Sequence, residues 1–212
     1  MTAKFWDQRS KKYDDAIKDD DSGYKKTIEA TTALLDSSDV VLDLGCASGE
    51  IGLDIAPHVA RIFGVDTSAK MIELATEKVF RTQINNARFE QADAFDQQLD
   101  DFSFSAVLAL NIFHLVDDIP KVLNRLRDLL PPGGLLISQT PCLGERGWFF
   151  RALIGALQKV GVAPVISELR IHDLESLVLS SGFDIVETTV WDEKDAIQWI
   201  VAKNLCSIDE RK

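Results

Sequence analysis

Cysteine is scarce in this sequence of 212 residues, and its three copies lie far apart. Cys46, Cys142 and Cys206 form no CxxC pair and are odd in number, which argues against a metal site and against a disulfide framework. We therefore expect no bound metal. The first fifteen residues, MTAKFWDQRSKKYDD, are mixed and charged and lack the apolar core of a signal peptide. A reducing cytoplasm is the expected compartment.

Basic residues are also in short supply, because 23 Lys and Arg stand against 34 Asp and Glu, a net charge of −11. An acidic surface repels phosphate backbones, so no nucleic-acid partner is expected. Long apolar runs are missing as well. The most apolar stretch, residues 148–160, is too short to span a bilayer, and we expect no transmembrane segment.

In the middle of the chain, strand-like apolar runs alternate with segments of helical spacing. Short apolar or β-branched runs predict strands over residues 40–44, 61–66, 87–92, 104–110 and 134–140. Helical spacing predicts helices over 68–80, with Ser68 as N-cap, and over 118–130, which PPGG ends. The apolar faces expected for them are Met71, Ile72, Ala75 and Val79, and Ile119, Val122, Leu123, Leu126, Leu129 and Leu130. This alternation is typical of right-handed βαβ crossovers and a mainly parallel sheet covered on both faces.

The two flanks of this core have simpler patterns. At the front, spacing predicts one helix through Trp6, Tyr13 and Ile17, a solvated turn at 19–22, and a second helix through Tyr24, Ile28, Thr31 and Leu35. At the back, HDLESLVLSSGF predicts a helix with Gly182 as C-cap. Two strand-like runs follow it, separated by the charged turn 192–195. This pattern predicts an antiparallel hairpin at the sheet edge, with residues 207–212 as a frayed tail.

The end of the first predicted strand and the loop after it carry an acidic residue where a phosphate loop would not. This segment reads VVLDLGCASGE from residue 40. Gly45 and Gly49 let the backbone approach a ligand at the carboxyl end of a strand, where open α/β sheets bind ligands. A dinucleotide fingerprint needs two more glycines, where this chain has Ala47 and Glu50. Pyrophosphate would also meet the carboxylate of Asp43, so a nicotinamide oxidoreductase is disfavoured and a cationic ligand is favoured.

Two further carboxylates follow the next two predicted strands. Asp66 ends the second strand, where a carboxylate accepts hydrogen bonds from two vicinal ribose hydroxyls. Asp93 follows the third strand, where a carboxylate can accept a hydrogen bond from an adenine amino group. Together with Asp43, these residues predict a ligand that is a nucleoside with a cationic group at its other end.

Five segments in order resemble the successive motifs of class I S-adenosylmethionine-dependent methyltransferases: VLDLGCASGEIG, FGVDTSAKMIELA, FEQADAFD, FSAVLALNIFHLVDD and LLPPGGLLIS. The likeness covers residues 38–140 and is nearest to the small-molecule subgroup that includes quinone-biosynthesis enzymes. It implies a Rossmann-like, doubly wound, mainly parallel seven-stranded sheet with an antiparallel C-terminal edge hairpin and helices on both faces. It also implies one methyltransferase domain over 1–212, made of an N-terminal helical cap (1–37), the cofactor-binding core (38–140), a lid-like insertion (141–170) and the C-terminal helix and hairpin (171–206).

The same resemblance implies roles for individual residues in binding S-adenosylmethionine. The residues so assigned are Asp43, Gly45, Cys46, Ala47 and Gly49 for the methionine part, Asp66 for the ribose, Thr67, Met71, Asp93 and Ala94 for the adenine, Asn111 for the sulfonium, and Tyr13 as a cover over the cofactor. Cys46 would contribute mainly backbone. For Met71 a place in the core is equally open, and the family often has glycine where this chain has Ala47.

His114, after the fourth predicted strand, is the candidate catalytic residue, as a base or substrate contact. A structural role on its loop is the alternative, because methyl transfer needs a base only for a protonated nucleophile and positioning supplies much of its catalysis. The helix expected over 148–160 is apolar nearly all round, so it must be buried or meet an apolar partner. It would pack across the sheet edge or in a dimer, or else form a lid over a hydrophobic substrate with transient contact to a membrane surface.

The sequence thus predicts methyl transfer from S-adenosylmethionine, with S-adenosylhomocysteine as product, to a small apolar or aromatic acceptor. The N-terminal helices and residues 142–168 would bind that acceptor, and the protein would be a monomer or a homodimer. One alternative is a non-catalytic S-adenosylmethionine-binding regulatory protein. Another is an RNA methyltransferase, which the scarcity of Lys and Arg around residues 43–50 and 93–118 disfavours.

Overall fold

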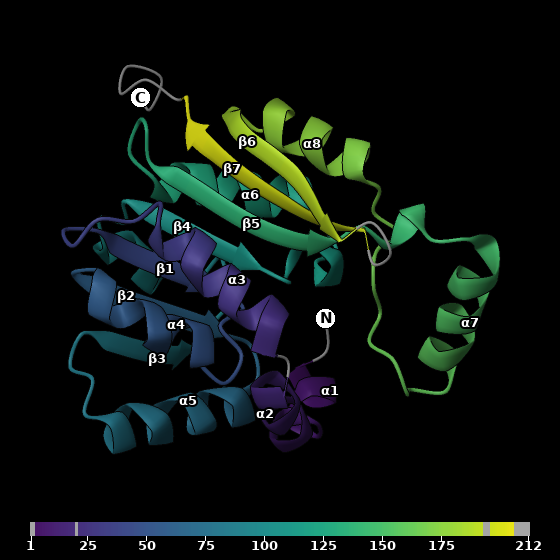
Figure 1. Cartoon of the computed structure of the whole chain (residues 1–212), viewed down its shortest axis with the longest axis horizontal. Coiled ribbons are helices and arrows are strands. Elements are labelled where there is room, and N and C mark those ends of the chain that lie inside the picture. Colours follow the sequence, from purple (N-terminus) through teal and green to yellow (C-terminus); the bar gives the residue numbers. More distant parts are fainter. Residues whose placement is uncertain (1–2, 20, 193–195, 206–212) are drawn as a thin grey trace. The chain divides into compact units, whose positions relative to one another are not determined.

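The computed structural model describes residues 3–19, 21–192 and 196–205, and its strands form one mixed sheet (Figure 1). The strand order is β3-β2-β1-β4-β5-β7-β6. The strands are β1 (Val40–Leu44), β2 (Arg61–Asp66), β3 (Ala87–Gln91), β4 (Ala106–Leu110), β5 (Leu135–Pro141), β6 (Phe183–Asp192) and β7 (Ile197–Asn204). β1 to β4 pair in parallel, and β7 runs antiparallel to both β5 and β6. The predicted Rossmann-like fold class is confirmed, including the antiparallel hairpin.

Eight α-helices lie in the described residues, and the chain divides into two compact units, one up to Leu108 and the other from Ala109. The helices are α1 (Ala3–Asp7), α2 (Ser10–Asp19), α3 (Asp21–Thr32), α4 (Glu50–Ile55), α5 (Ala69–Thr82), α6 (Ile119–Leu129), α7 (Trp148–Lys159) and α8 (Ile171–Ser180). The single domain expected over 1–212 stays a prediction. Cys206, the tail 207–212 and most of the turn 192–195 lie outside the described residues.

The N-terminal unit is built from parallel βαβ crossovers, in which α4 joins β1 to β2 and α5 joins β2 to β3. The register sets Asp43 of β1 opposite Gly64 of β2 and Leu108 of β4. β4 is buried along its whole length. Continuous burial is expected of a parallel strand covered on both faces, and it explains why the apolar run alone predicted this strand.

Helix α5 begins as predicted but turns a different face to the core. The Ser68 hydroxyl accepts a hydrogen bond from the Met71 backbone N–H at 3.2 Å, which confirms the N-cap. The buried side chains are those of Met71, Ala75 and Lys78, while Ile72 and Val79 are half-buried. The core stripe therefore passes through a lysine that the apolar pattern had left out.

The N-terminal helices differ from the prediction. The single helix expected through Trp6 and Tyr13 is two helices, α1 and α2, and the expected turn at 19–22 is wrong because α2 reaches Asp19 and α3 begins at Asp21. The side chain of Ile17 lies outside the described part. At the break, Arg9 stacks on the Phe5 ring at 3.9 Å. Asp7, which ends α1, accepts hydrogen bonds from the Ser68 hydroxyl (2.7 Å) and the Lys70 backbone N–H (3.1 Å). These tertiary contacts fix the end of α1.

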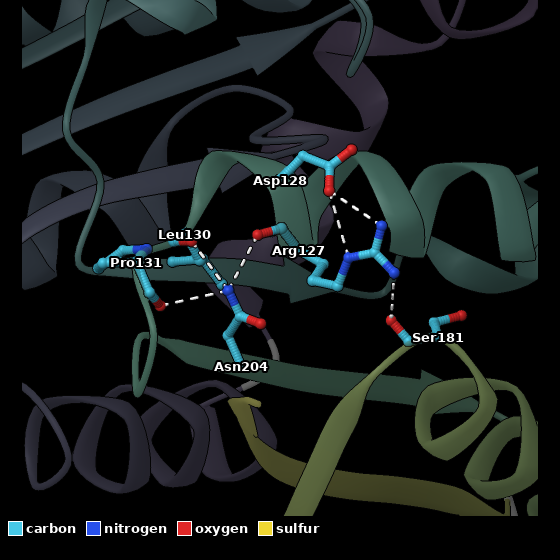
Figure 2. A network of polar contacts seen from close by, with 6 residues as sticks. All are labelled: Arg127, Asp128, Leu130, Pro131, Ser181 and Asn204. Carbon is cyan, nitrogen blue, oxygen red and sulfur yellow. Dashed lines mark hydrogen bonds and ion pairs between the residues drawn. The ribbon is translucent and has the colours of Figure 1, made fainter. Parts of the chain in front are cut away.

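The C-terminal unit is held together by its last strand. Figure 2 shows the Asn204 side-chain nitrogen, at the end of β7, donating to the carbonyls of Arg127 (3.1 Å), Leu130 (2.8 Å) and Pro131 (3.3 Å). The Arg127 guanidinium in turn donates to the Ser181 carbonyl at 3.3 Å. These bonds satisfy carbonyls left over at the end of α6 and so fix β7 against that helix.

The amphipathic pattern of α6 is confirmed, because all six residues expected on its apolar face are buried. Gly182, predicted as a C-cap, has a left-handed φ of 86° just after α8. Among the described residues, no helix has the length and apolarity needed to cross a membrane.

Candidate functional site

The loop between β1 and α4 has a tightly specified backbone. The N–H groups of Gly45 and Cys46 both donate to the Val65 carbonyl, at 2.8 and 3.0 Å. Gly45, Ala47 and Gly49 all have left-handed φ angles, of 73°, 47° and 76°. For Ala47 this conformation costs about 1–2 kcal/mol. It is stabilised by the hydrogen bond from the Ala47 N–H to Asp66 Oδ2 at 3.1 Å.

Gly49 of this loop, Gly52 of α4 and Gly64 of β2 make room for an aromatic ring. A Cβ at Gly49 would lie 2.9 Å from Ala75 Cβ and 3.0 Å from Phe89 Cζ, and a Cβ at Gly52 or Gly64 would also meet the Phe89 ring. Phe89 is buried on β3. Gly49 is therefore required by its φ and by internal packing, and not only by approach to a ligand. Phe89 was missed from the sequence, where it looks like an ordinary core residue.

Asp43 is a buried carboxylate without compensation. The residue is 3% exposed, and among the described residues its Oδ2 has no hydrogen-bond partner. Burial, with a smaller contribution from the negative charge of Asp66, raises the pKa of Asp43 from 3.8 to about 7. A buried, unpaired carboxylate is costly, and a cation brought to it would remove that cost.

Asp66, at the end of β2, is half-buried and already organises its own loop. Its Oδ2 accepts the Ala47 N–H, and its Oδ1 accepts the Ser68 N–H at 2.8 Å. Burial raises its pKa, although these backbone hydrogen bonds act in the opposite direction. An ionised carboxylate accepts about four hydrogen bonds, so Asp66 retains acceptor capacity for a ligand hydroxyl beside its backbone donors.

Tyr13 of α2 lies close to these two carboxylates. Burial, and then the negative charges of Asp66 and Asp43, raise the pKa of the Tyr13 hydroxyl to about 12. The Tyr13 ring packs edge-to-face against Trp6, with the ring centroids 5.6 Å apart. The fold thus brings together three predicted site residues that are far apart in the sequence.

The other predicted residues of the N-terminal unit have less distinctive settings. Met71 and Ala94 are buried, at 2% and 5% exposure, and Thr67 is half-buried with its carbonyl accepting from the Gln91 side chain at 3.2 Å. Asp93 is exposed, and its Oδ1 accepts the Phe95 N–H at 2.7 Å. Cys46 is buried, and burial raises the pKa of its thiol. The described residues contain no group of three or more His, Cys, Asp or Glu side chains placed to hold a metal ion.

Asn111 and His114 belong to the C-terminal unit. Asn111 has a left-handed φ of 57°, and its N–H donates to the Gln139 carbonyl at 2.7 Å. His114 lies in a short 3₁₀ turn, Phe113–Leu115, and its carbonyl accepts the Ser167 N–H at 2.8 Å. Burial lowers the pKa of His114 to about 4, and within the described part of the chain its Nδ1 is buried without a partner. The imidazole is therefore neutral at physiological pH.

Helix α7 presents apolar side chains to solvent. None of its residues is buried, and Figure 1 shows it apart from the strands of its own unit. Trp148 is 78% exposed, Phe149 71% and Leu153 50%. Its other side lines a small pocket of about 50 Å³ with Leu143 and residues 166–168. That volume holds a few water molecules at most.

One charged cluster beside the loop was not foreseen. The buried Lys78 ammonium contacts the carboxylates of Asp14 and Glu50 and the Ser48 carbonyl. The signal in the sequence was the position of Lys78, three residues after Ala75 and seven after Met71, which places it on the core stripe of a helix.

Comparison with known proteins gives the family of this chain. Residues 35–160 match the family model described as a methyltransferase domain. The chain is 32% identical over 119 residues to 27-O-demethylrifamycin SV methyltransferase from Amycolatopsis mediterranei, covering 51% of this chain and 44% of that protein. It is 37% identical over 103 residues to trans-aconitate 2-methyltransferase from Deinococcus radiodurans, covering 48% of this chain and 37% of that protein. The chain thus spans less than half the length of these curated relatives.

The fold has close counterparts among solved structures. Magnesium protoporphyrin IX methyltransferase from Synechocystis PCC 6803, solved with bound S-adenosylhomocysteine, superposes with a TM-score of 0.67 at 19% identity, covering 86% of this chain and 83% of that one. This chain therefore belongs to the methyltransferase domain family, and its fold is that of class I S-adenosylmethionine-dependent methyltransferases. The resemblance, the enzyme class and the cofactor predicted from the sequence are confirmed; the quinone-biosynthesis subgroup stays a prediction.

The residues of the N-terminal unit fit this cofactor. Its amino-acid end carries an ammonium group, and the Asp43 carboxylate, whose Oδ2 has no partner among the described residues, lies near the end of β1, just before the glycine loop of residues 45–49. Its ribose carries two vicinal hydroxyls, and Asp66 retains acceptor capacity. Met71 is so deeply buried that its side chain serves the core, which favours the second of its two expected roles.

Proposed function

We propose that this protein transfers a methyl group from S-adenosylmethionine to a small apolar or aromatic acceptor. When bound, the cofactor supplies an electrophilic methyl group on a sulfonium. The observation that carries the acceptor class is the exposure of Trp148, Phe149 and Leu153 on α7, since apolar side chains in such numbers on one short helix suit an apolar partner. The proposal agrees with the small-molecule names of the relatives, which describe those proteins alone.

The cofactor-binding roles follow from the settings of the residues. In the proposal, Asp43 receives the ammonium of the amino-acid end, and the left-handed backbone at Gly45, Ala47 and Gly49 keeps the loop in its turn. Asp66 accepts from the ribose hydroxyls. The remaining members of the predicted set keep the roles assigned from the sequence, namely Tyr13, Cys46, Thr67, Asp93, Ala94 and Asn111.

His114 is proposed as a neutral base or a contact to the acceptor. Its lowered pKa leaves the imidazole unprotonated, so it can accept a proton throughout the physiological range. Its buried Nδ1 has no partner among the described residues, and an acceptor hydroxyl or a water is the kind of group that would satisfy it. An acceptor that arrives deprotonated would need no such base.

Binding and turnover test this proposal separately. Isothermal titration with S-adenosylhomocysteine should give micromolar or tighter binding, and its absence at high micromolar concentration would refute the cofactor assignment. Labelled S-adenosylmethionine incubated with a panel of aromatic and apolar metabolites should then yield a methylated product. Cofactor binding without turnover on any acceptor would favour the regulatory alternative, and turnover only on RNA would favour the RNA methyltransferase.

The role of α7 has a matched control. Phe149→Ser should raise the KM for the acceptor by about tenfold, because a large apolar contact is lost, while binding of S-adenosylhomocysteine and Tm stay unchanged. Leu179→Ser, at a position 52% exposed on α8, should change none of the three. Equal effects of the two substitutions would remove α7 from acceptor binding.

Three further predictions concern partners and location. Residues 142–170 carry four Lys or Arg against two Asp or Glu, a net +2 in a chain of net −11, so transient contact with an anionic membrane surface remains proposed for α7. Cosedimentation with anionic and neutral vesicles measures it. Analytical ultracentrifugation decides between monomer and homodimer, and cell fractionation tests the cytoplasmic location.

A further inference from the structure

Lys78 is an unusual residue for the interior of this fold. The side chain extends from α5, and the residue is only 4% exposed. Transfer of an ammonium group out of water costs several kcal/mol unless close partners compensate it. A buried ammonium is stable only where close partners compensate its charge, so the identity of those partners indicates what the residue does.

The partners come from two segments at the candidate cofactor site. Lys78 Nζ donates to the Ser48 carbonyl at 2.9 Å and lies 2.9 Å from Glu50 Oε1, so it holds the last residues of the glycine loop and the start of α4. It also donates to Asp14 Oδ1 on α2. One ammonium therefore joins the loop to α2, although Lys78 and Asp14 are 64 residues apart in the sequence.

Asp14 directly follows Tyr13, whose hydroxyl lies near Asp43 and Asp66. The contact between Lys78 and Asp14 thus sets where α2 presents Tyr13. The neighbouring helix is tied down independently, since Asp7 of α1 accepts from Ser68 at the start of α5. The first turn of α5 therefore holds the end of α1, and Lys78, about three turns further along α5, holds α2.

Lys78 is the ammonium that two carboxylates share in this cluster. Asp14 and Glu50 are both acidic and both face the same ammonium. With the ammonium removed, their mutual repulsion would drive α2 away from the loop. The Ser48 carbonyl would also lose a donor, so the loop and α2 would loosen together.

We propose that Lys78 is a positioning residue that couples the glycine loop to α2, so that α2 with Tyr13 is held over the site when the loop is ordered by the cofactor. This inference rests on the proposed cofactor site. It makes cofactor affinity and the order of α2 interdependent, because whatever stabilises one stabilises the other. Lys78 itself need not touch the cofactor.

The test uses the full chain and two neighbouring substitutions. Asp14→Ala removes the carboxylate that ties α2 to Lys78 and leaves Glu50 and Ser48 in place. Asp15→Ala is the matched control, because Asp15 is the same residue type on the same helix but is exposed. The two readouts are the affinity for S-adenosylhomocysteine by titration and the amide exchange of residues 10–19 by mass spectrometry, with and without that ligand.

Asp14→Ala should weaken S-adenosylhomocysteine binding by about five- to tenfold. It should also abolish the slowing of α2 exchange that the ligand causes in the wild type, while exchange in β1 and β2 stays slow. Asp15→Ala should behave as the wild type. Identical behaviour of the two variants would overturn the proposal. Faster exchange throughout β1 and β2 would overturn it too, because Asp14 would then support the whole fold.

A failure of the proposed function looks different. If the wild type binds no S-adenosylhomocysteine, the cofactor assignment fails. The comparison of α2 exchange between Asp14→Ala and Asp15→Ala without ligand still decides whether Lys78 holds α2.

Discussion

Replacing Asp43 with asparagine should change folding and cofactor binding in opposite directions. Asp43→Asn keeps the shape of the side chain and removes its charge. Asp43 as a residue is 3% exposed, and its Oδ2 has no partner among the described residues. The same group is the one proposed to receive the cationic end of the cofactor. Folding without ligand should therefore gain from the substitution, whereas binding should lose.

The sign and size follow from the pKa. Burial raises the pKa of Asp43 from 3.8 to about 7, so the folded protein binds this proton more tightly than the unfolded chain does. The associated stability is fully present below pH 3.8 and is lost as the pH rises to 7. The full penalty at pH 8 is about 4 kcal/mol, and about 3 kcal/mol of it appears between pH 5 and pH 8.

The assay is unfolding in urea at both pH values without ligand. Asparagine does not titrate, so its own desolvation cost is the same at pH 5 and pH 8. The advantage of Asp43→Asn over the wild type should therefore be about 3 kcal/mol larger at pH 8 than at pH 5. In thermal melts this difference corresponds to about 6–12 °C. Asp15→Asn, at an exposed position on α2, should show no such difference.

Binding should change in the opposite direction. A hydrogen bond to a charged group contributes about 1.5–3 kcal/mol, so Asp43→Asn should weaken S-adenosylhomocysteine binding by about ten- to 150-fold. Wild-type affinity should fall about tenfold from pH 8 to pH 6, as Asp43 takes up its proton, and the variant should not show this dependence. Equal losses of stability and affinity at both pH values would refute the reasoning and make Asp43 a structural turn residue.

Three further substitutions test other parts of the structure. The lowered pKa of His114 gives stability that is present above pH 6.5 and is lost as the pH falls toward 4. The wild type should therefore lose about 3 kcal/mol of its free energy of unfolding over that range through His114, and His114→Asn should not show this loss. Unfolding in urea at both pH values measures the difference. Asn204→Ala should lose about 1–3 kcal/mol, because three carbonyls lose their donor, while the exposed Asn85→Ala should stay within about 0.5 kcal/mol of the wild type. Gly49→Ala and Gly133→Ala both place alanine at a left-handed φ, but only the first also clashes, so it should be less stable than the second by about 1–3 kcal/mol in the same assay.

The regular elements of the core could be predicted because their causes are local. β1 and β2 begin and end at the predicted residues, and the six apolar positions of α6 are all buried. A buried parallel strand needs a short apolar run, and an amphipathic helix needs an apolar stripe. Both patterns lie within one short segment of the sequence and can be recognised there. The acidic residues at the ends of β1 and β2 were found for the same reason, since strand ends mark where ligands bind.

The sequence by itself therefore determined the strands, most of the helices, the sheet class, the cofactor family and the carboxylates Asp43 and Asp66. Only the tertiary structure decided the break between α1 and α2, the packing of the Phe89 ring against glycines of three different segments, the raised pKa of Asp43 and the burial of Lys78. Each of these depends on which distant side chains meet and how much water they exclude. Asp14 and Lys78 are 64 residues apart, and no local pattern specifies that the two charges will share one buried position.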